Sequence, residues 1–100
     1  AMPGYLARAT LKVFGPSKYA QAQCIAWYEN DYTWVISGTG DYSPWQINYA
    51  SWSGTFDFSR LDGPATYSNA VYAATAAYRI SSGGTNWNPW VVYWRDRVCH

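Results

Sequence analysis

The stretch AQCIAWYEN, residues 22–30, decides the fold and raises the question of function. Its apolar positions have the spacing i, i+3 and i+4 of one face of an α-helix, and they are Ala22, Ile25 and Ala26. Glu29 falls at i+7 and extends the same stripe. Ser17 can supply an N-cap before it. We therefore expect a helix over residues 18–30 whose last turn carries a carboxylate on the core-facing side.

Glu29 is unusual because a carboxylate on an apolar stripe loses hydration. Burial disfavours the charged form and raises the pKa of the carboxyl. The negative end of the helix dipole in the last turn acts in the same direction. A raised pKa suits a general acid at neutral pH. The alternative for a single terminal glutamate is a frayed helix end at which Glu29 points to water.

The rest of the chain predicts further helices around one small hairpin. In chain order we expect a helix over 4–13, extended runs over 33–37 and 42–49 that pair as a hairpin, a loop over 51–67, a helix over 68–80 and a last helix over 90–98. Breaks are predicted by Gly15-Pro16, Gly38 to Gly40, Ser81 to Gly84, and Asn88-Pro89, in which Asn88 is an N-cap candidate. This pattern predicts a single α+β domain, mostly helical, over residues 1–100.

The composition is that of a folded domain with many aromatic rings. Apolar residues make up 49% of the chain and charged residues 13%, which excludes intrinsic disorder. Aromatic residues reach 20%, with seven Trp and ten Tyr. A small domain needs such large side chains for its core, and the exposed ones give flat surfaces on which sugar rings can stack.

Charge and hydropathy exclude several function classes. The net charge is +1 with scattered basic residues, so no nucleic-acid partner is expected. No apolar run reaches the roughly 20 residues of a membrane span, and no signal peptide is visible. Ala1-Met2 is interpreted as a cloning remnant on a mature chain. Nothing predicts a cofactor or more than a monomer.

Two cysteines, Cys24 and Cys99, leave three alternatives: a disulfide, two inert core thiols, or half a metal site. A metal site is disfavoured because the only histidine is His100. We favour the disulfide, which would indicate an oxidising, extracytoplasmic location.

Four segments together resemble the lysozyme superfamily. They are CIAWYEN (24–30), GDYSPWQIN (40–48), FDFSRLDGPATYSNAVYAATAAYR (56–79) and NWNPWVVYWRDRVC (86–99). The first, second and fourth are similar to animal-type lysozymes, whereas the third looks more like bacterial and phage relatives, including lytic transglycosylases. The resemblance covers about residues 5–99. It implies a lysozyme-like fold with a short hairpin beside a substrate cleft.

The resemblance implies a glycosidase that cuts the β-1,4 bond between N-acetylmuramic acid and N-acetylglucosamine. Glu29 is then the catalytic acid and Asp41 the second carboxylate. Cys24 and Cys99 become the disulfide that joins the acid's helix to the C-terminal helix. The implied partner is peptidoglycan or a chitin-like oligosaccharide, and the implied protein is a secreted, antimicrobial wall-lysing enzyme.

The resemblance also implies substrate contacts. Gln46 and Asn48 match residues that meet the sugar's N-acetyl group, and we expect them to share one strand face while Trp45 and Ile47 point into the core. Their alternative role is hydrogen bonding within the hairpin. Two further residues match the family pattern. Trp52 is expected to stack on a sugar ring, or simply to pack within the fold, and Trp90 is expected to pack on the catalytic acid.

Departures from the family pattern weaken the assignment of Asp41 more than that of Glu29. Asn30 follows the acid in place of Ser, and Ser43-Pro44 replace the usual Gly and a strand residue that donates a hydrogen bond. Asp41 can also be an ordinary turn residue. The alternatives are therefore a lytic transglycosylase that forms 1,6-anhydro products, or a non-catalytic glycan-binding module.

The other acids and two tyrosines have structural interpretations. Asp31 and Asp57 are expected to be solvated or structural. Tyr72 and Tyr78, on the predicted helix over 68–80, are expected in the core.

Overall fold

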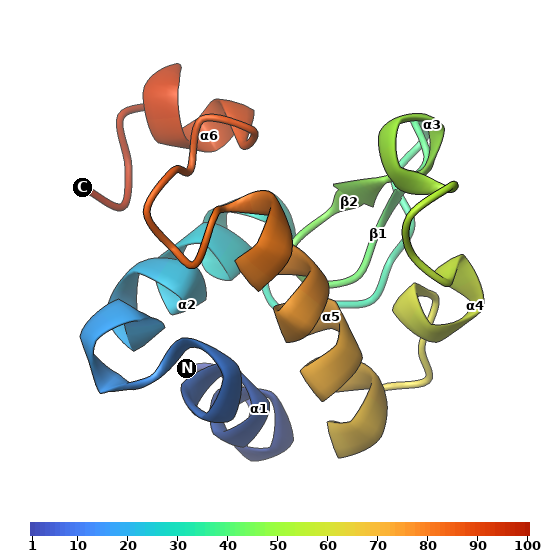
Figure 1. Ribbon diagram of the computed structural model, residues 1–100, viewed down its shortest axis with the longest axis horizontal. Helices are drawn as coiled ribbons and strands as arrows, with labels where there is room; N and C mark the ends of the chain where they lie inside the picture. The colour runs from blue at the N-terminus through green and yellow to red at the C-terminus, as the bar shows by residue number, and fades with distance from the viewer.

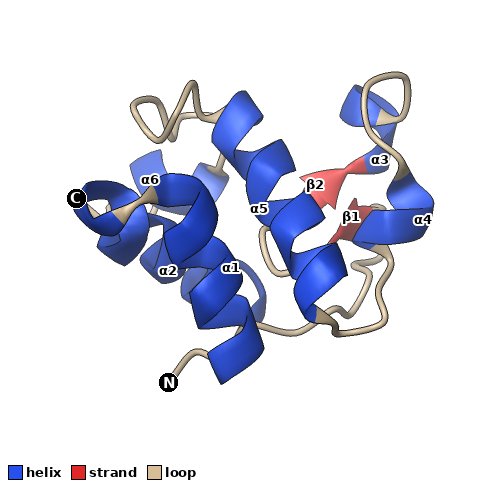
Figure 2. Ribbon diagram, turned by 60° about the horizontal axis from the view of Figure 1, so that its bottom comes forward, coloured by secondary structure: helices blue, strands red, loops and turns tan.

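The computed structural model describes residues 1–100, and its central element is α5, Tyr67–Ile80. Figures 1 and 2 show α5 between two groups of elements. The helices α1 (Gly4–Phe14), α2 (Pro16–Asn30) and α6 (Val91–Trp94) form one group. The other group contains β1 (Asp41–Tyr42), β2 (Ile47–Asn48), α3 (Tyr49–Trp52) and α4 (Phe58–Leu61). The expected α+β, mostly helical architecture is therefore confirmed.

Small side chains on α5 allow its close packing with α1. The buried face of α5 consists of Ala70, Ala73, Ala74, Ala76 and Ala77. Because alanine adds little bulk, the two backbones approach closely and Leu6 of α1 becomes fully buried. Thr66 caps α5, its side chain accepting a hydrogen bond from the Asn69 backbone N–H at 3.2 Å. The predicted helix over 68–80 is confirmed to within one residue.

The corner between α1 and α2 differs slightly from the prediction. Gly15 takes a left-handed φ of 75°, and Pro16 occupies the first turn of α2. Proline is well suited there, because the first backbone N–H groups of a helix have no intrahelical partner. The helix therefore begins two residues before Lys18, and Ser17 lies inside it instead of capping it.

Tryptophan side chains connect the two groups of elements through the core. Trp45, fully buried, donates its indole N–H to the Ala22 carbonyl of α2 at 3.0 Å. Trp90 in turn donates to the Trp45 carbonyl at 2.8 Å. Ile47 is only 2% exposed, so the prediction that Trp45 and Ile47 both enter the core is confirmed. These bonds satisfy buried polar groups and fix the hairpin against α2.

Apart from Asp41, the hairpin lies within the second predicted run, so the predicted strand over 33–37 is wrong. Only residues 41–42 and 47–48 pair, with Asp41 opposite Asn48. The chain reverses between them because Ser43 (φ 73°) takes a left-handed conformation and Pro44 cannot donate to a ladder. Residues 33–37 are held by isolated bonds: the Ser37 backbone N–H donates to the Asp41 carbonyl, and the Asn30 and Gln46 side-chain amides donate to the Val35 carbonyl. Val35 stays 65% exposed.

Two further predictions are corrected. The expected loop over 51–67 contains the end of α3 and the whole of α4. The last helix ends at Trp94 and not near 98, and Asn88 does not cap it. Arg97 and Cys99 take left-handed φ values of 56° and 66°, which a right-handed helix cannot include.

The disulfide between Cys24 and Cys99 is present and joins α2 to the C-terminal segment. Gln21 reinforces this link by donating its side-chain amide to the Cys99 carbonyl at 2.7 Å. None of the helices combines the length and the apolar character that crossing a bilayer requires.

Candidate functional site

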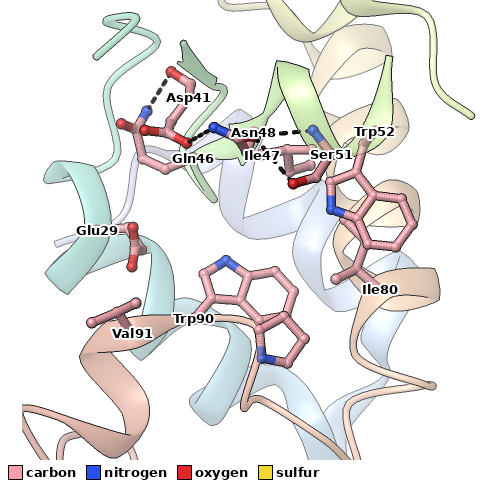
Figure 3. Close-up of a pocket in the computed structure, with 11 residues that line it drawn as sticks. Glu29, Asp41, Gln46, Ile47, Asn48, Ser51, Trp52, Ile80, Trp90 and Val91 are labelled. Atoms are coloured by element: carbon pink, nitrogen blue, oxygen red, sulfur yellow. Dashed lines mark hydrogen bonds between the residues drawn. The ribbon is translucent and has the colours of Figure 1, made fainter. Parts of the chain in front are cut away.

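A cleft of about 460 Å³ lies between the two groups of elements (Figure 3). All six side chains predicted to act or bind there line it: Glu29, Asp41, Gln46, Asn48, Trp52 and Trp90. They come from α2, the hairpin, α3 and the segment before α6, which are far apart in the sequence. The structure therefore brings the predicted set together in one cleft.

Glu29 lies in the last turn of α2 with its carboxyl facing the cleft, close to Trp90 and Val91 (Figure 3). Its carboxyl oxygens make no hydrogen bond within the protein, so they are free to meet a ligand. Burial, chiefly, and then the charge of Asp41 raise the pKa of Glu29 to about 7. Glu29 is half-buried, and the raised pKa keeps its carboxyl partly protonated near neutral pH.

Two charges from the C-terminal segment also act on Glu29. Arg95 lowers the pKa of Glu29 and Asp96 raises it, and both effects are smaller than that of burial. Arg95 and Asp96 form the single ion pair of the chain, Nε to Oδ1 at 3.1 Å, so their charges partly cancel. No pattern near Glu29 in the sequence could have shown this pair, because the disulfide and α6 bring it there.

Asp41, at the start of β1, has the opposite environment. Partial burial acts to raise its pKa, but hydrogen bonds from Ser37, Thr39 and Asn48 outweigh burial and hold the pKa below its ordinary value. The Ser37 and Thr39 hydroxyls donate to Oδ2 at 2.5 and 2.6 Å. The Asn48 amide donates to Oδ1 at 3.0 Å. Asp41 is therefore an oriented carboxylate, ionised at neutral pH.

Gln46 does not share a strand face with Asn48, which corrects the prediction. It precedes β2 in a left-handed conformation, φ 51°, at the end of the turn. Its amide nitrogen lies within hydrogen-bond distance of the Val35, Asp41 and Ser43 carbonyls, at 3.0 to 3.3 Å. The amide nitrogen is thus used by the hairpin and its neighbouring segment, and no hydrogen bond within the protein uses the side-chain oxygen.

Asn48 is likewise occupied by structural bonds. Besides donating to Asp41, it caps α3 by accepting from the Ser51 backbone N–H at 3.0 Å. Its side chain therefore joins the hairpin, α3 and the oriented carboxylate. The geometry of Asn48 thus matches its alternative role, hydrogen bonding within the hairpin. Contact of Asn48 with a substrate remains a prediction.

Trp52 and Trp90 form apolar walls at different depths of the cleft. Trp52 is half-buried at the end of α3, far from Glu29 along the cleft (Figure 3). Trp90 is 5% exposed, and its ring centroid lies 4.9 Å from that of Trp87. Trp90 is thus mainly a core residue whose edge reaches the cleft near Glu29. Trp52 has the more accessible ring face.

Five lining residues were missed by the sequence analysis: Ile47, Ser51, Ile80, Pro89 and Val91. Ile47 was assigned to the core only. The spacing of Asn48 and Ser51 is a capping pattern that could have revealed α3. For Ile80 and Val91 no local signal exists, because their place depends on how α5 and α6 meet the hairpin.

The remaining predicted residues lie outside the cleft. Asp57 is exposed and caps α4 by accepting from the Ser59 backbone N–H, and Asp31 is the exposed, left-handed C-cap of α2. Tyr72 packs against the core, and its hydroxyl accepts from the Asp57 N–H. Tyr78 is 39% exposed, so its assignment to the core is wrong.

The site can therefore perform acid–base chemistry with two carboxyl groups whose pKa values are driven apart. No group of three or more His, Cys, Asp or Glu side chains is placed to hold a metal ion. Comparisons of the chain with protein-family models, with curated proteins and with solved structures give no match. The geometry and the sequence motifs thus carry the functional argument.

Proposed function

We propose that this protein is a lysozyme-like glycoside hydrolase that cleaves the β-1,4 bond between N-acetylmuramic acid and N-acetylglucosamine in peptidoglycan. The observation that carries the proposal is the Glu29 carboxyl. It faces an open cleft, makes no hydrogen bond within the protein, and has its pKa raised to about 7. Such a group is a general acid that is protonated at the pH where it works.

In this mechanism Glu29 gives its proton to the leaving glycosidic oxygen. Positive charge then develops at the anomeric carbon, and the ionised Asp41 stabilises it across the cleft. Three hydrogen bonds to Asp41 delocalise its negative charge and hold its orientation. This environment favours electrostatic stabilisation by Asp41 over covalent attack on the sugar. Water then attacks the anomeric carbon and gives a proton to the Glu29 carboxylate, which restores the acid and leaves a reducing end.

The substrate class follows from the walls of the cleft. Trp52 offers an accessible ring face, and the free Gln46 oxygen can accept a hydrogen bond from an amide N–H. An acetamido sugar presents both a ring face and an amide N–H. The disulfide between Cys24 and Cys99 supports a secreted, extracytoplasmic protein.

The test is clearing of a peptidoglycan suspension by wild type and by Glu29→Gln. Glutamine keeps the shape of the side chain but cannot give up a proton, so we expect clearing to slow by about 10²–10⁴-fold. Asp57→Asn is the matched control, since Asp57 is an exposed carboxylate outside the cleft and asparagine also caps a helix. Equal clearing by wild type and Glu29→Gln would exclude Glu29 as the acid.

The pH profile gives a second readout of the same assignment. Because the pKa of Glu29 is raised to about 7, we expect kcat/KM to fall as pH rises through 7. On the acidic side, activity is expected to persist to below the ordinary Asp range, because the pKa of Asp41 is lowered. A profile that stays flat from pH 6 to pH 9 would contradict the proposal.

Lytic transglycosylase activity is the second candidate, and the three hydrogen bonds to Asp41 favour it. A carboxylate already committed to Ser37, Thr39 and Asn48 is a weak base for activating water. In this reaction the 6-hydroxyl of the muramyl residue attacks the anomeric carbon in place of water and gives its proton to the Glu29 carboxylate. Mass spectrometry of the products separates the two reactions, because hydrolysis leaves reducing ends and transglycosylation leaves 1,6-anhydro ends. Binding to the wall with neither product would indicate a glycan-binding module.

A further inference from the structure

A second hollow, of about 400 Å³, lies outside the cleft and shares no lining residue with it. It is lined by Asn88, Tyr93, Trp94, Arg97 and His100. The segment 88–94 therefore contributes to both hollows: its residues 89–91 line the cleft, and residues 88, 93 and 94 line the second hollow. The mechanism proposed above uses none of the residues of the second hollow.

The aromatic wall of this hollow is held in place before any ligand arrives. The Trp94 side chain is 55% exposed, yet its indole N–H donates to the Asn88 carbonyl at 3.1 Å. That bond fixes the ring across the segment and leaves no polar group of the indole unsatisfied. Tyr93 and His100 stack at 4.2 Å between ring centroids, with an interplanar angle of 16°. A fixed ring loses little conformational freedom when a flat ligand packs on it.

The charge of this hollow is a single unpaired cation. Arg97 makes neither an ion pair nor a side-chain hydrogen bond in the structure. The adjacent acid, Asp96, is engaged by the Arg95 guanidinium through two bonds of 3.1 Å, one to each carboxylate oxygen. Arg97 is therefore the group in the hollow that can meet a carboxylate of a ligand, through its planar fork of donors.

We propose that this second hollow is a non-catalytic binding site for a sugar unit that carries a short peptide with a free carboxylate. The sugar ring lies on the exposed face of Trp94, and the carboxylate of the attached peptide meets Arg97. The site itself follows from the hollow, the fixed indole and the unpaired guanidinium. The choice of a muramyl glycopeptide as ligand rests on the function proposed above. Such a site would keep the enzyme on the insoluble wall between cleavage events.

The test follows the seven tryptophan indole N–H signals by NMR in the Glu29→Gln protein, which prevents turnover. The Trp94 signal is assigned by its loss in Trp94→Ala. Three probes are titrated: N-acetylmuramyl dipeptide, neutral chitotriose, and the same dipeptide without sugar. We expect the muramyl dipeptide to shift the Trp94 signal with the highest affinity of the three. Tighter or equal binding of the dipeptide alone would overturn the proposal in favour of a peptide site.

Variants then separate stacking from charge. Trp94→Ala is expected to weaken binding of the muramyl dipeptide at this site, read from the remaining signals, by about tenfold. Arg97→Gln is expected to weaken it by about threefold because the guanidinium is exposed, while Arg97→Lys keeps most of the affinity. Trp27→Ala is the matched control: Trp27 is 45% exposed and lines neither hollow. A loss as large in Trp27→Ala as in Trp94→Ala would overturn the assignment.

Failure of this site and failure of the proposed function are distinguishable. With Glu29 intact, Trp94→Ala is expected to cleave soluble oligosaccharides of alternating N-acetylglucosamine and N-acetylmuramic acid as wild type does, but to clear insoluble wall more slowly. A shift of the Trp52 signal alone, with Trp94 unaffected by every probe, would remove the second site and leave the enzyme proposal untouched. Absence of wall clearing by wild type would remove the enzyme proposal while the Trp94 shifts still report the second site.

Discussion

Glu29 and Asp41 both place a carboxyl group in the cleft, yet their pKa values are shifted in opposite directions. Burial is the largest influence on both carboxyls, and it acts to raise both pKa values. Asp41 receives three side-chain hydrogen bonds that favour its charged form, whereas Glu29 receives none. The net result is a raised pKa for Glu29 and a lowered one for Asp41. Deeper burial of Glu29 and hydrogen bonding to Asp41 together decide which carboxyl keeps its proton near neutral pH.

The raised pKa of Glu29 predicts that the site reduces the stability of the fold at high pH. The pKa is about 7 in the folded protein against an ordinary 4.5, so the folded state holds the proton more tightly. The resulting stabilisation is complete below pH 4.5 and is lost as pH rises through 7. We expect Glu29→Gln to raise the free energy of unfolding by about 1–2 kcal/mol at pH 8, discounted for partial exposure, and hardly at pH 4. Urea denaturation at the two pH values measures this difference, and equal gains at both would contradict it.

At the scale of elements, α6 is the part of the site that depends most on contacts with other segments. It has four residues, no side-chain cap and no buried residue of its own. An isolated helix of that length is not stable, so its place depends on the segment around it. Three links hold that segment: the hydrogen bond from Trp90 to the Trp45 carbonyl, the disulfide at Cys99, and the hydrogen bond from Gln21 to the Cys99 carbonyl. The apolar surroundings of Glu29 depend on these links.

Trp90→Phe tests the first link. Phenylalanine cannot donate to the buried Trp45 carbonyl and leaves part of the indole volume empty. We expect the free energy of unfolding to fall by about 2–3 kcal/mol. The pKa of Glu29 is expected to fall toward its ordinary value, as measured by carboxyl ¹³C NMR titration. Trp94→Phe is the control on the same segment, since its ring is exposed. An unchanged Glu29 pKa in Trp90→Phe would mean that other groups bury the acid.

At the scale of the whole molecule, the disulfide closes most of the chain into a loop. Cys24 and Cys99 are 75 residues apart in the sequence, and the C-terminal segment otherwise contacts α2 only lightly. Cross-linking over such a distance removes many conformations from the unfolded chain. The same bond places Arg95 and Asp96, with their charges, near the acid on α2.

Replacing both cysteines tests this role. We expect Cys24→Ser with Cys99→Ser to lower the free energy of unfolding by about 4 kcal/mol, because the unfolded chain regains its loop entropy. Reduced wild-type protein is the control and should unfold at the same denaturant concentration as the double variant. A loss below about 1 kcal/mol would show that the α6 segment is held by packing and not by the cross-link.

Local patterns in the sequence determined the helices α1, α2 and α5, because apolar spacing and terminal residues act within a few positions of each other. They also placed Glu29 on a core-facing stripe and identified the two cysteines. The strand over 33–37 failed because β pairing depends on a partner, and residues 41–42 found theirs at 47–48.

Only the tertiary structure decided the chemistry around these residues. The sequence placed a carboxylate at a helix end, but the hydrogen bonds to Asp41 and the nearness of Arg95 to Glu29 arise from contacts between distant segments. The second hollow beside Trp94 arises in the same way. Burial and electrostatic fields depend on distances through space, whereas periodicity and capping depend on distances along the chain. For that reason the sequence could single out Glu29, whereas the fold determined the pKa of its carboxyl.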